Sequence, residues 1–184
     1  MVTPEFQPFF LASVGASAAL IGLLFVSVSI APERVFGKQS DAVRQAQALS
    51  AFSALANIFF ISLMSLIPDV LFGLVVWIVA LPAIAQTLGL LVHARRWREE
   101  GIVLRGVFLF LVSAGIYSYE FVLGIQMWRD PADKGALIAL TFLLIGAYAV
   151  GLGRAWELLG APRSGILTNL AALVLRRREP AKKP

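Results

Sequence analysis

The sequence contains no cysteine and a single histidine, His93. The lack of cysteine excludes disulfides, thiolate metal sites and thiol catalysis, and one histidine excludes a multi-histidine metal site within one chain. Charged residues are scarce, at 15% of 184 residues, whereas a soluble domain carries about a quarter. Hydrophobic residues make up 59% and stand in long blocks with few interruptions. Because such blocks are typical of helices in lipid, we expect an integral membrane protein.

Motifs of enzyme chemistry are also missing. The sequence has no H-E-x-x-H, no paired intramembrane carboxylates and no Walker glycine loop. An intramembrane serine nucleophile needs a base, and the only histidine lies at a helix end, well away from Ser17. We therefore expect a protein that is not an enzyme and that needs no cofactor or metal.

The apolar blocks predict an all-α fold with five membrane-spanning helices. The block at 46–93 is too long for one crossing, because at about 1.5 Å per residue it extends roughly 70 Å. Pro68 and Asp69 supply a turn inside it. The first block is longer than the apolar region of a signal peptide and no Lys or Arg precedes it, so we expect it to be retained. The predicted spans are 9–30, 46–67, 70–93, 103–128 and 135–156.

A basic tail at 158–184 follows the predicted transmembrane domain at 1–157. The tail holds an apolar helical stripe formed by Ile166, Leu167, Leu170, Leu173 and Val174. Three arginines come directly after the stripe, Arg176, Arg177 and Arg178. This pattern predicts a short interfacial amphipathic helix whose arginines bind anionic lipid head groups at the cytoplasmic face. A plain solvated tail is the alternative.

The basic residues set the predicted orientation. Fourteen of the 16 Lys and Arg residues lie in segments that face one side of a five-span protein, and only Arg129 and Lys134 face the other. Basic loops stay cytoplasmic, so we expect the N terminus outside and the C terminus inside. Because the basic residues flank apolar blocks instead of sharing one exposed face, the net charge of +5 predicts no nucleic-acid binding.

Glu120 lies within the apolar and aromatic run IYSYEFVLGIQMW at 116–128. Its face of the helix continues through Ser113, Tyr117, Gly124 and Met127, at steps of three and four residues. Since this face is small and polar beside the glutamate, we expect it to point into protein. Tyr117 is placed to donate its hydroxyl to the carboxyl group, and burial favours the neutral acid.

Three other helices carry a polar residue at a depth similar to that of Glu120. At about 1.5 Å per residue, Glu120 lies roughly 13 Å below the outer surface, and Ser17, Asn57 and Thr141 fall within a few residues of that level. The sequence therefore predicts a polar seam in the outer half of the membrane, with Asn57 and Ser17 beside Glu120.

A second stripe runs toward the inner surface through Pro82, Gln86, Gly89 and His93. Pro82 frees the carbonyl of Ile78 and favours a kink. Gln86 either lines a wet path or simply bonds to a neighbouring helix. Both interpretations remain open on the sequence.

The first predicted helix is rich in small residues. The pairs Ser13/Ser17, Gly15/Ala19 and Ala18/Gly22 have the small-xxx-small spacing that lets helix backbones approach closely. We expect this helix to be central, within the protomer or at a symmetry axis. If it lines an axial pore, Ser13, Ser17 and Ser27 are open to water; in a scaffold they are packed and dry.

A different pair, Arg154 and Glu157, stands at the inner end of the fifth predicted helix. An arginine there can extend to the interface, so we interpret the two residues as a surface pair.

The segment AALIGLLFVSVSI at 18–30 resembles the first helix of uncharacterised small bacterial polytopic membrane proteins, which implies a bacterial inner membrane. SAALIGLLFV at 17–26, with AFSA at 51–54 and LIPD at 66–69, is similar to helices of Orai-type calcium channels, which form oligomeric pores. The outer glutamate and inner basic ring of that family are missing here, so calcium selectivity does not carry over.

These observations lead to two functional hypotheses. In the first, the protein is a homo-oligomeric channel or conductor for small ions or protons, with Glu120, Asn57, Gln86 and Ser17 on or beside the route. In the second, it is a non-catalytic accessory or scaffolding subunit of a membrane-protein complex, whose polar residues hold its own helices together.

Overall fold

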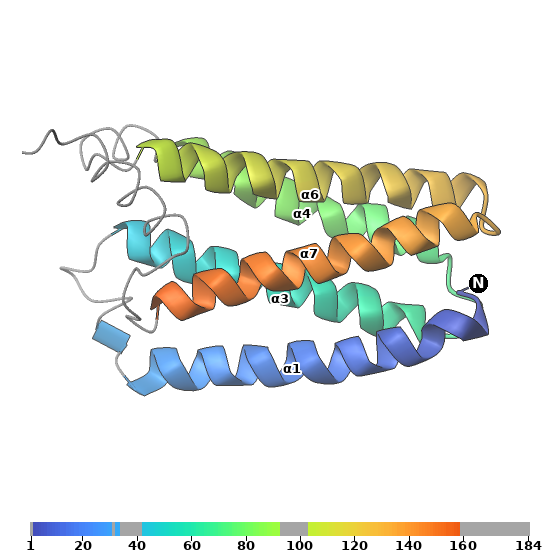
Figure 1. Cartoon of the computed structure of the whole chain (residues 1–184), viewed down its shortest axis with the longest axis horizontal. Coiled ribbons are helices and arrows are strands. Elements are labelled where there is room, and N and C mark those ends of the chain that lie inside the picture. The colour runs from blue at the N-terminus through green and yellow to red at the C-terminus, as the bar shows by residue number, and fades with distance from the viewer. Residues whose placement is uncertain (1, 31, 34–41, 93–102, 159–184) are drawn as a thin grey trace, which may run out of the picture.

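The computed structural model describes residues 2–30, 32–33, 42–92 and 103–158, and its helices run along the long axis of the molecule (Figure 1). The described part of the chain contains helices and turns and no strand. A single 3-10 turn precedes five long helices: η1 (Pro4–Phe6), α1 (Gln7–Ile30), α3 (Ala42–Ser65), α4 (Phe72–Val92), α6 (Val103–Arg129) and α7 (Lys134–Leu158).

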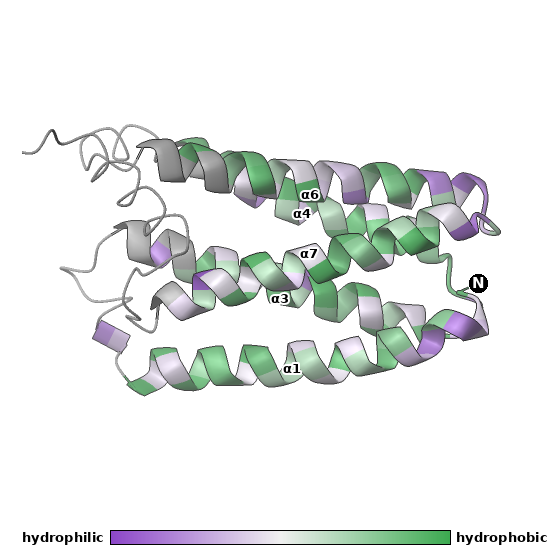
Figure 2. Ribbon diagram, viewed as in Figure 1, coloured by the Kyte–Doolittle hydropathy of each residue, from purple (hydrophilic) through white to green (hydrophobic). Residues whose placement is uncertain are grey.

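The five long helices are long and apolar enough to cross a membrane, which confirms an all-helical fold with five candidate spans. Their ends lie within four residues of the predicted ones. Hydrophobic residues line all five helices (Figure 2), and Leu11, Ile30 and Phe142 are 65%, 79% and 70% exposed. A surface this apolar is typical of a lipid-facing bundle. The predicted interfacial helix and Arg176, Arg177 and Arg178 lie outside the described residues.

Two short turns stand at one end of the bundle. The turn after α3 holds Pro68 and Asp69, and Asp69 has a φ of 58°, a left-handed conformation that aspartate tolerates better than most residues. The turn before α7 ends at Asp133, whose carboxylate accepts a hydrogen bond from the Ala136 N–H at 3.0 Å. This bond caps the N terminus of α7. We call this end, which also carries η1, the turn end, and the opposite end the far end.

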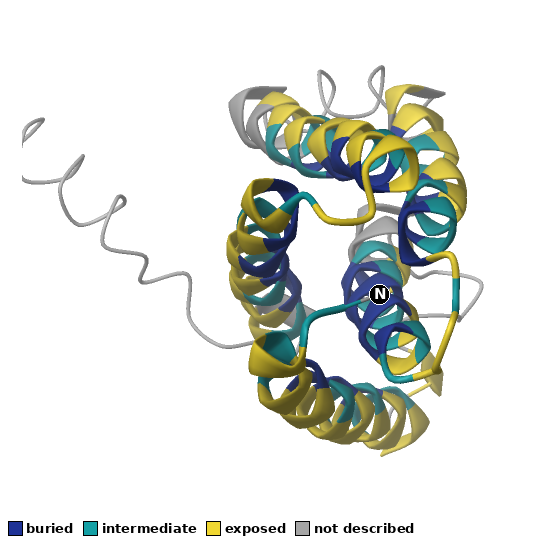
Figure 3. Cartoon of the chain, turned by 90° about the vertical axis from the view of Figure 1, so that its right-hand side faces the viewer, coloured by how far each residue is buried: buried dark blue, intermediate teal, exposed yellow. Residues whose placement is uncertain are grey.

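Helix α3 is the most central element. It packs against α1, α4 and α7, while α6 packs against α4 and α7. Figure 1 accordingly shows α4 and α6 on one side, α1 on the other, and α3 and α7 between them. In the end-on view of Figure 3 the buried residues face inward and exposed residues form the outside.

The apolar core occupies the half of the bundle next to the turn end. Its members come from the ends of helices that meet there, and include Phe10, Ile61, Phe72, Met127 and Leu140. Buried polar contacts between helices lie in both halves, with Ser13–Ser62 and Asn57–Glu120 toward the turn end and Arg154–Ser50 toward the far end.

Helices α4 and α6 approach most closely at two glycines. A Cβ added at Gly124 lies 2.5 Å from the backbone nitrogen of Trp77, and one added at Gly73 lies 2.2 Å from that of Trp128. Each helix thus supplies a glycine and, four residues later, a tryptophan: GLVVW at 73–77 and GIQMW at 124–128. The two segments pair reciprocally because the helices are antiparallel. Sequence reasoning missed this pattern, although both segments are visible in the sequence.

Candidate functional site

Glu120 lies entirely inside the bundle. Its side chain is 0% exposed, and its Oε1 accepts a hydrogen bond from Nδ2 of Asn57 on α3 at 2.8 Å. The other four residues of its predicted face, Ser113, Tyr117, Gly124 and Met127, are also buried. The structure thus brings Glu120 and Asn57 together, as predicted. The sequence suggested Tyr117 as the hydrogen-bond donor to Glu120, whereas in the structure the donor is Asn57.

Two oxygens of the Glu120–Asn57 pair are buried without a hydrogen-bond partner. They are Oε2 of Glu120 and Oδ1 of Asn57. Both atoms are acceptors in an ionised carboxylate and a neutral amide. Such orphaned acceptors are rare inside proteins and call for a physical explanation.

Arg154 is the second buried ionisable residue at the candidate site, and its placement corrects a sequence interpretation. Its side chain is 3% exposed, so it does not form a surface pair. One guanidinium nitrogen donates to the hydroxyl of Ser50 on α3, and Nη2 donates to the hydroxyl of Ser113 on α6 at 2.5 Å. The bundle interior therefore provides hydroxyl acceptors for both terminal nitrogens of this guanidinium, while its Nε is buried without a hydrogen-bond partner.

Tyr117 lies between these two groups on the inward face of α6. It follows Ser113 by four residues, precedes Glu120 by three and is 5% exposed. It therefore shares the buried face of α6 with Ser113, which bonds to Arg154, and with Glu120. We call Arg154, Ser113, Tyr117, Glu120 and Asn57 the polar column.

The sequence does not single out Arg154, because a basic residue near a helix end also fits a topology signal. The necessary signal was nevertheless present on α7. Leu140, Leu144, Ala147 and Gly151 precede Arg154 at steps of four and three residues, and all five are buried. The same helical periodicity predicts that Glu120 faces inward.

Gln86 bridges α4 and α3. Its side-chain oxygen accepts a hydrogen bond from the hydroxyl of Ser53. Pro82 and Gly89, which share its predicted stripe, are exposed, and His93 lies outside the described residues. The stripe therefore points largely outward, and Gln86 bonds to a neighbouring helix as one of the two sequence interpretations held.

The serines of α1 are used in packing. Ser13 and Ser17 are buried, and Ser62 of α3 donates to Ser13 Oγ at 3.0 Å. The hydroxyl of Tyr148 on α7 lies 2.9 Å from Ser13 Oγ and donates to the Ser13 carbonyl at 2.6 Å. Sequence reasoning did not identify Ser62 or Tyr148.

The remaining hydroxyls of the predicted seam bond to their own helices. Ser17 donates to the carbonyl of Ser13 at 2.7 Å, and Ser27 donates to that of Leu23 at 2.7 Å. Thr141 donates to the carbonyl of Ile138. An axial pore that uses Ser13 and Ser17 as its lining is therefore inconsistent with their burial within one chain.

The small residues of α1 face away from the rest of the chain. Ala19 is exposed, and a Cβ added at Gly15 or Gly22 meets no atom within 4 Å. Their packing role is thus absent within the described chain, because the buried face of α1 is the serine face. Contact with a second molecule stays a prediction.

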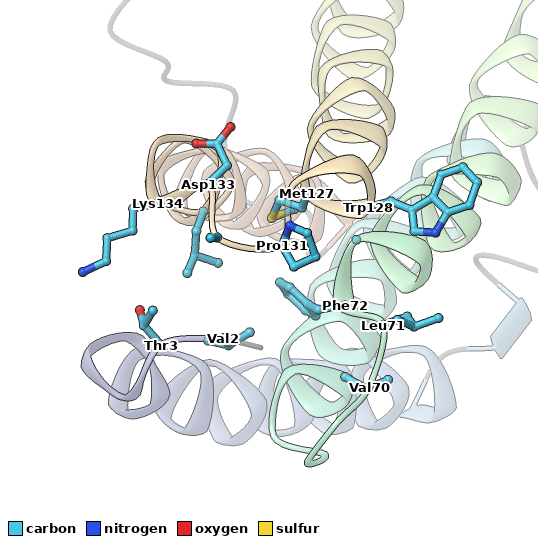
Figure 4. Close-up of a pocket in the computed structure, with 13 residues that line it drawn as sticks. Val2, Thr3, Val70, Leu71, Phe72, Met127, Trp128, Pro131, Asp133 and Lys134 are labelled. Carbon is cyan, nitrogen blue, oxygen red and sulfur yellow. The ribbon is translucent and has the colours of Figure 1, made fainter.

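A small pocket of about 70 Å³ lies at the turn end. Figure 4 shows Val2 and Thr3 on one side and Phe72, Met127 and Pro131 on another, with Lys134 nearby. Met127 follows Glu120 by seven residues, or about 10 Å along the helix. The pocket is therefore separate from the polar column, and the apolar core lies between them.

No family model, curated protein or solved structure matches the chain. The chemistry of the polar column is therefore the basis for inferring a function.

Proposed function

We propose that the protein conducts protons across a bacterial inner membrane, along a route inside each chain. The observation that supports this proposal is the polar column, which joins buried groups on α3, α6 and α7 within an apolar bundle. Ionisable groups at membrane depth are costly and characteristically mark proton relays or ion pathways.

Protons fit the column better than metal ions do. A proton can pass between carboxyl, phenol and hydroxyl groups, whereas Mg²⁺ or Ca²⁺ needs about six oxygen ligands. The described residues contain no group of three or more His, Cys, Asp or Glu that could hold a metal ion. The buried Glu120–Asn57 pair offers two unpartnered oxygens, too few for such an ion but suited to one proton.

The inward face of α6 suggests the side from which Glu120 exchanges its proton. Tyr117 and Ser113 continue from Glu120 toward Arg154 and the far end, while Leu123 and Met127 continue toward the turn end. We propose that the far end is cytoplasmic, with the N terminus outside, because most basic residues lie in the sequence segments that follow α1, α4 and α7. Glu120 then exchanges protons with the cytoplasm, and passage outward requires movement of Leu123 and Met127.

We also propose that the protein forms a homo-oligomer and binds anionic lipids. Gly15, Ala19 and Gly22 form an outward strip on which a second copy can pack closely. Arg176, Arg177 and Arg178 supply charge for anionic lipids.

The proposal is tested by proton flux into liposomes that contain the purified protein and a lumenal pH indicator. With a potassium diffusion potential as the driving force, we expect wild type to acidify the lumen and Glu120→Gln to abolish that flux. Glu5→Gln is the matched control, because Glu5 is an exposed carboxylate at the turn end and pairs with Lys134 at 3.6 Å. Equal flux in wild type and Glu120→Gln makes Glu120 a packing residue and contradicts the route.

An accessory subunit is the second candidate, and one specific observation favours it. The Ser13, Ser62 and Tyr148 hydroxyls are satisfied among themselves, which is how polar residues hold membrane helices together. Absence of flux for protons and for small ions, in a preparation shown to be folded, supports this candidate over conduction.

A further inference from the structure

We infer that Glu120 binds one proton on Oε2 and shares it with Oδ1 of Asn57, which closes a carboxylic acid–amide pair between α6 and α3. This inference deepens the proposed function and rests on it only for the role of the proton in transport. The proton-binding site itself depends on the geometry of two side chains.

The starting observation is that half of the pair is already formed. Nδ2 of Asn57 donates to Oε1 of Glu120 at 2.8 Å. A carboxyl group and a carboxamide are both planar and each carries two polar atoms side by side. In this pair, Nδ2 of Asn57 and Oε1 of Glu120 are already bonded. The second polar atoms of the same two planar groups are Oδ1 of Asn57 and Oε2 of Glu120.

Those second atoms are the two buried oxygens that lack a partner. With Glu120 ionised, both are acceptors, and leaving a buried polar group unpaired costs about 1–3 kcal/mol, more when it is charged. A proton on Oε2 converts that oxygen into a donor and gives Oδ1 the hydrogen bond it lacks. One proton thus satisfies both atoms and removes the buried charge.

No other described group supplies that missing donor. The titratable or charged side chains that are buried in the described bundle are Tyr117, Glu120 and Arg154. Arg154 is committed to Ser50 and Ser113, and Ser113 precedes Glu120 by seven residues, or about 10 Å along α6. From α4 the described buried residues are apolar except Thr87, whose hydroxyl donates to the carbonyl of Ala83. The buried Nε1–H of Trp77 on α4 has no hydrogen-bond partner, so it does not donate to either oxygen.

Proton release has a defined structural consequence. The reaction is dissociation of the Glu120 O–H bond, which leaves a carboxylate and transfers the proton to an acceptor along the column or to water beyond it. The Asn57–Glu120 bond remains, but Oε2 and Oδ1 become two facing acceptors. Loss of the proton therefore weakens one of the links between α3 and α6.

The test is infrared spectroscopy of the full chain in liposomes near neutral pH. We expect wild type to show the carbonyl stretch of a protonated carboxylic acid and Glu120→Gln to lose it. Glu5→Gln should leave that band unchanged, because Glu5 is exposed. Asn57→Leu should shift the band to higher frequency, since the carbonyl oxygen Oε1 loses its donor.

Glu120→Gln is expected to fold, because a glutamine amide can both donate to Oδ1 and accept from Nδ2 of Asn57. If it does not fold, the frequency shift in Asn57→Leu still decides the question. Absence of the band in wild type, or a band that neither variant changes, overturns the inference. A band without proton flux leaves the site standing and contradicts conduction, whereas flux without the band contradicts this pairing alone.

Discussion

At the scale of single residues, the burial of Glu120 and the burial of Arg154 are compensated in different ways. Each is an ionisable group inside an apolar bundle, where an isolated charge is strongly unfavourable. Arg154 keeps its charge and spreads it over hydroxyls from α3 and α6. Glu120 has one amide donor and one unpartnered oxygen, so a proton completes its environment.

Replacement of Arg154 measures how much its interior hydrogen bonds stabilise the bundle. We expect Arg154→Ala to lower the free energy of unfolding by about 1–3 kcal/mol, because the hydroxyls of Ser50 and Ser113 lose a charged donor. Arg129→Ala is the control, since Arg129 is exposed at the end of α6. The measurement is the midpoint of thermal unfolding of each variant in lipid–detergent micelles. Equal midpoints for the two variants contradict an interior role for Arg154.

At the scale of helices, the closest helix–helix contact lies between α4 and α6. It depends on Gly73 and Gly124, where a Cβ atom would overlap the neighbouring backbone. By contrast, Gly15 and Gly22 of α1, which belong to small-xxx-small pairs, face open space within the described chain. The difference arises because a small residue shortens the distance between helices only when a neighbour lies over it. Spacing alone does not identify the neighbour.

Alanine substitutions on α6 test this contact directly. Gly124→Ala should destabilise the protein by roughly 1–3 kcal/mol, because the new methyl group overlaps the Trp77 backbone and the helices must separate. Gly115→Ala on the same helix is the matched control, since a Cβ there meets no atom within 4 Å. The measurement is the same unfolding midpoint. A control as destabilised as Gly124→Ala would show that the effect is not one of packing.

At the scale of the whole molecule, the polar column extends from Glu120 toward the far end, while Leu123 and Met127 lie between Glu120 and the turn end on α6. Both side chains belong to the apolar core. The proposed conduction therefore needs a second conformation, in which a proton can pass these side chains. The proposed sense of proton exchange depends on which end faces the cytoplasm.

Orientation can be measured with single cysteines, because the natural chain has none. Ala132 is exposed at the turn end, and Glu33 is exposed three residues beyond the last residue of α1, so each is replaced singly by cysteine. With the N terminus outside, an impermeant maleimide should label the first variant in intact spheroplasts and the second only after permeabilisation. The reverse pattern places the N terminus inside and inverts the proposed sense of proton exchange.

Much of the secondary structure follows from the amino-acid sequence alone. Long apolar blocks predicted five spans, and Pro68 with Asp69 marked a turn, because chain length, hydropathy and backbone sterics are local properties. Helical periodicity also predicted that Glu120 faces inward. A period of 3.6 residues fixes which side chains share a face, whatever the neighbouring helix is.

Which polar groups meet depends instead on how the helices pack against one another. Asn57 instead of Tyr117 donates to Glu120, Arg154 turns inward to Ser50 and Ser113, and the small face of α1 points outward. These outcomes depend on the relative rotation and depth of helices that are distant in sequence. Many packed side chains set that arrangement jointly, and no single helix encodes it.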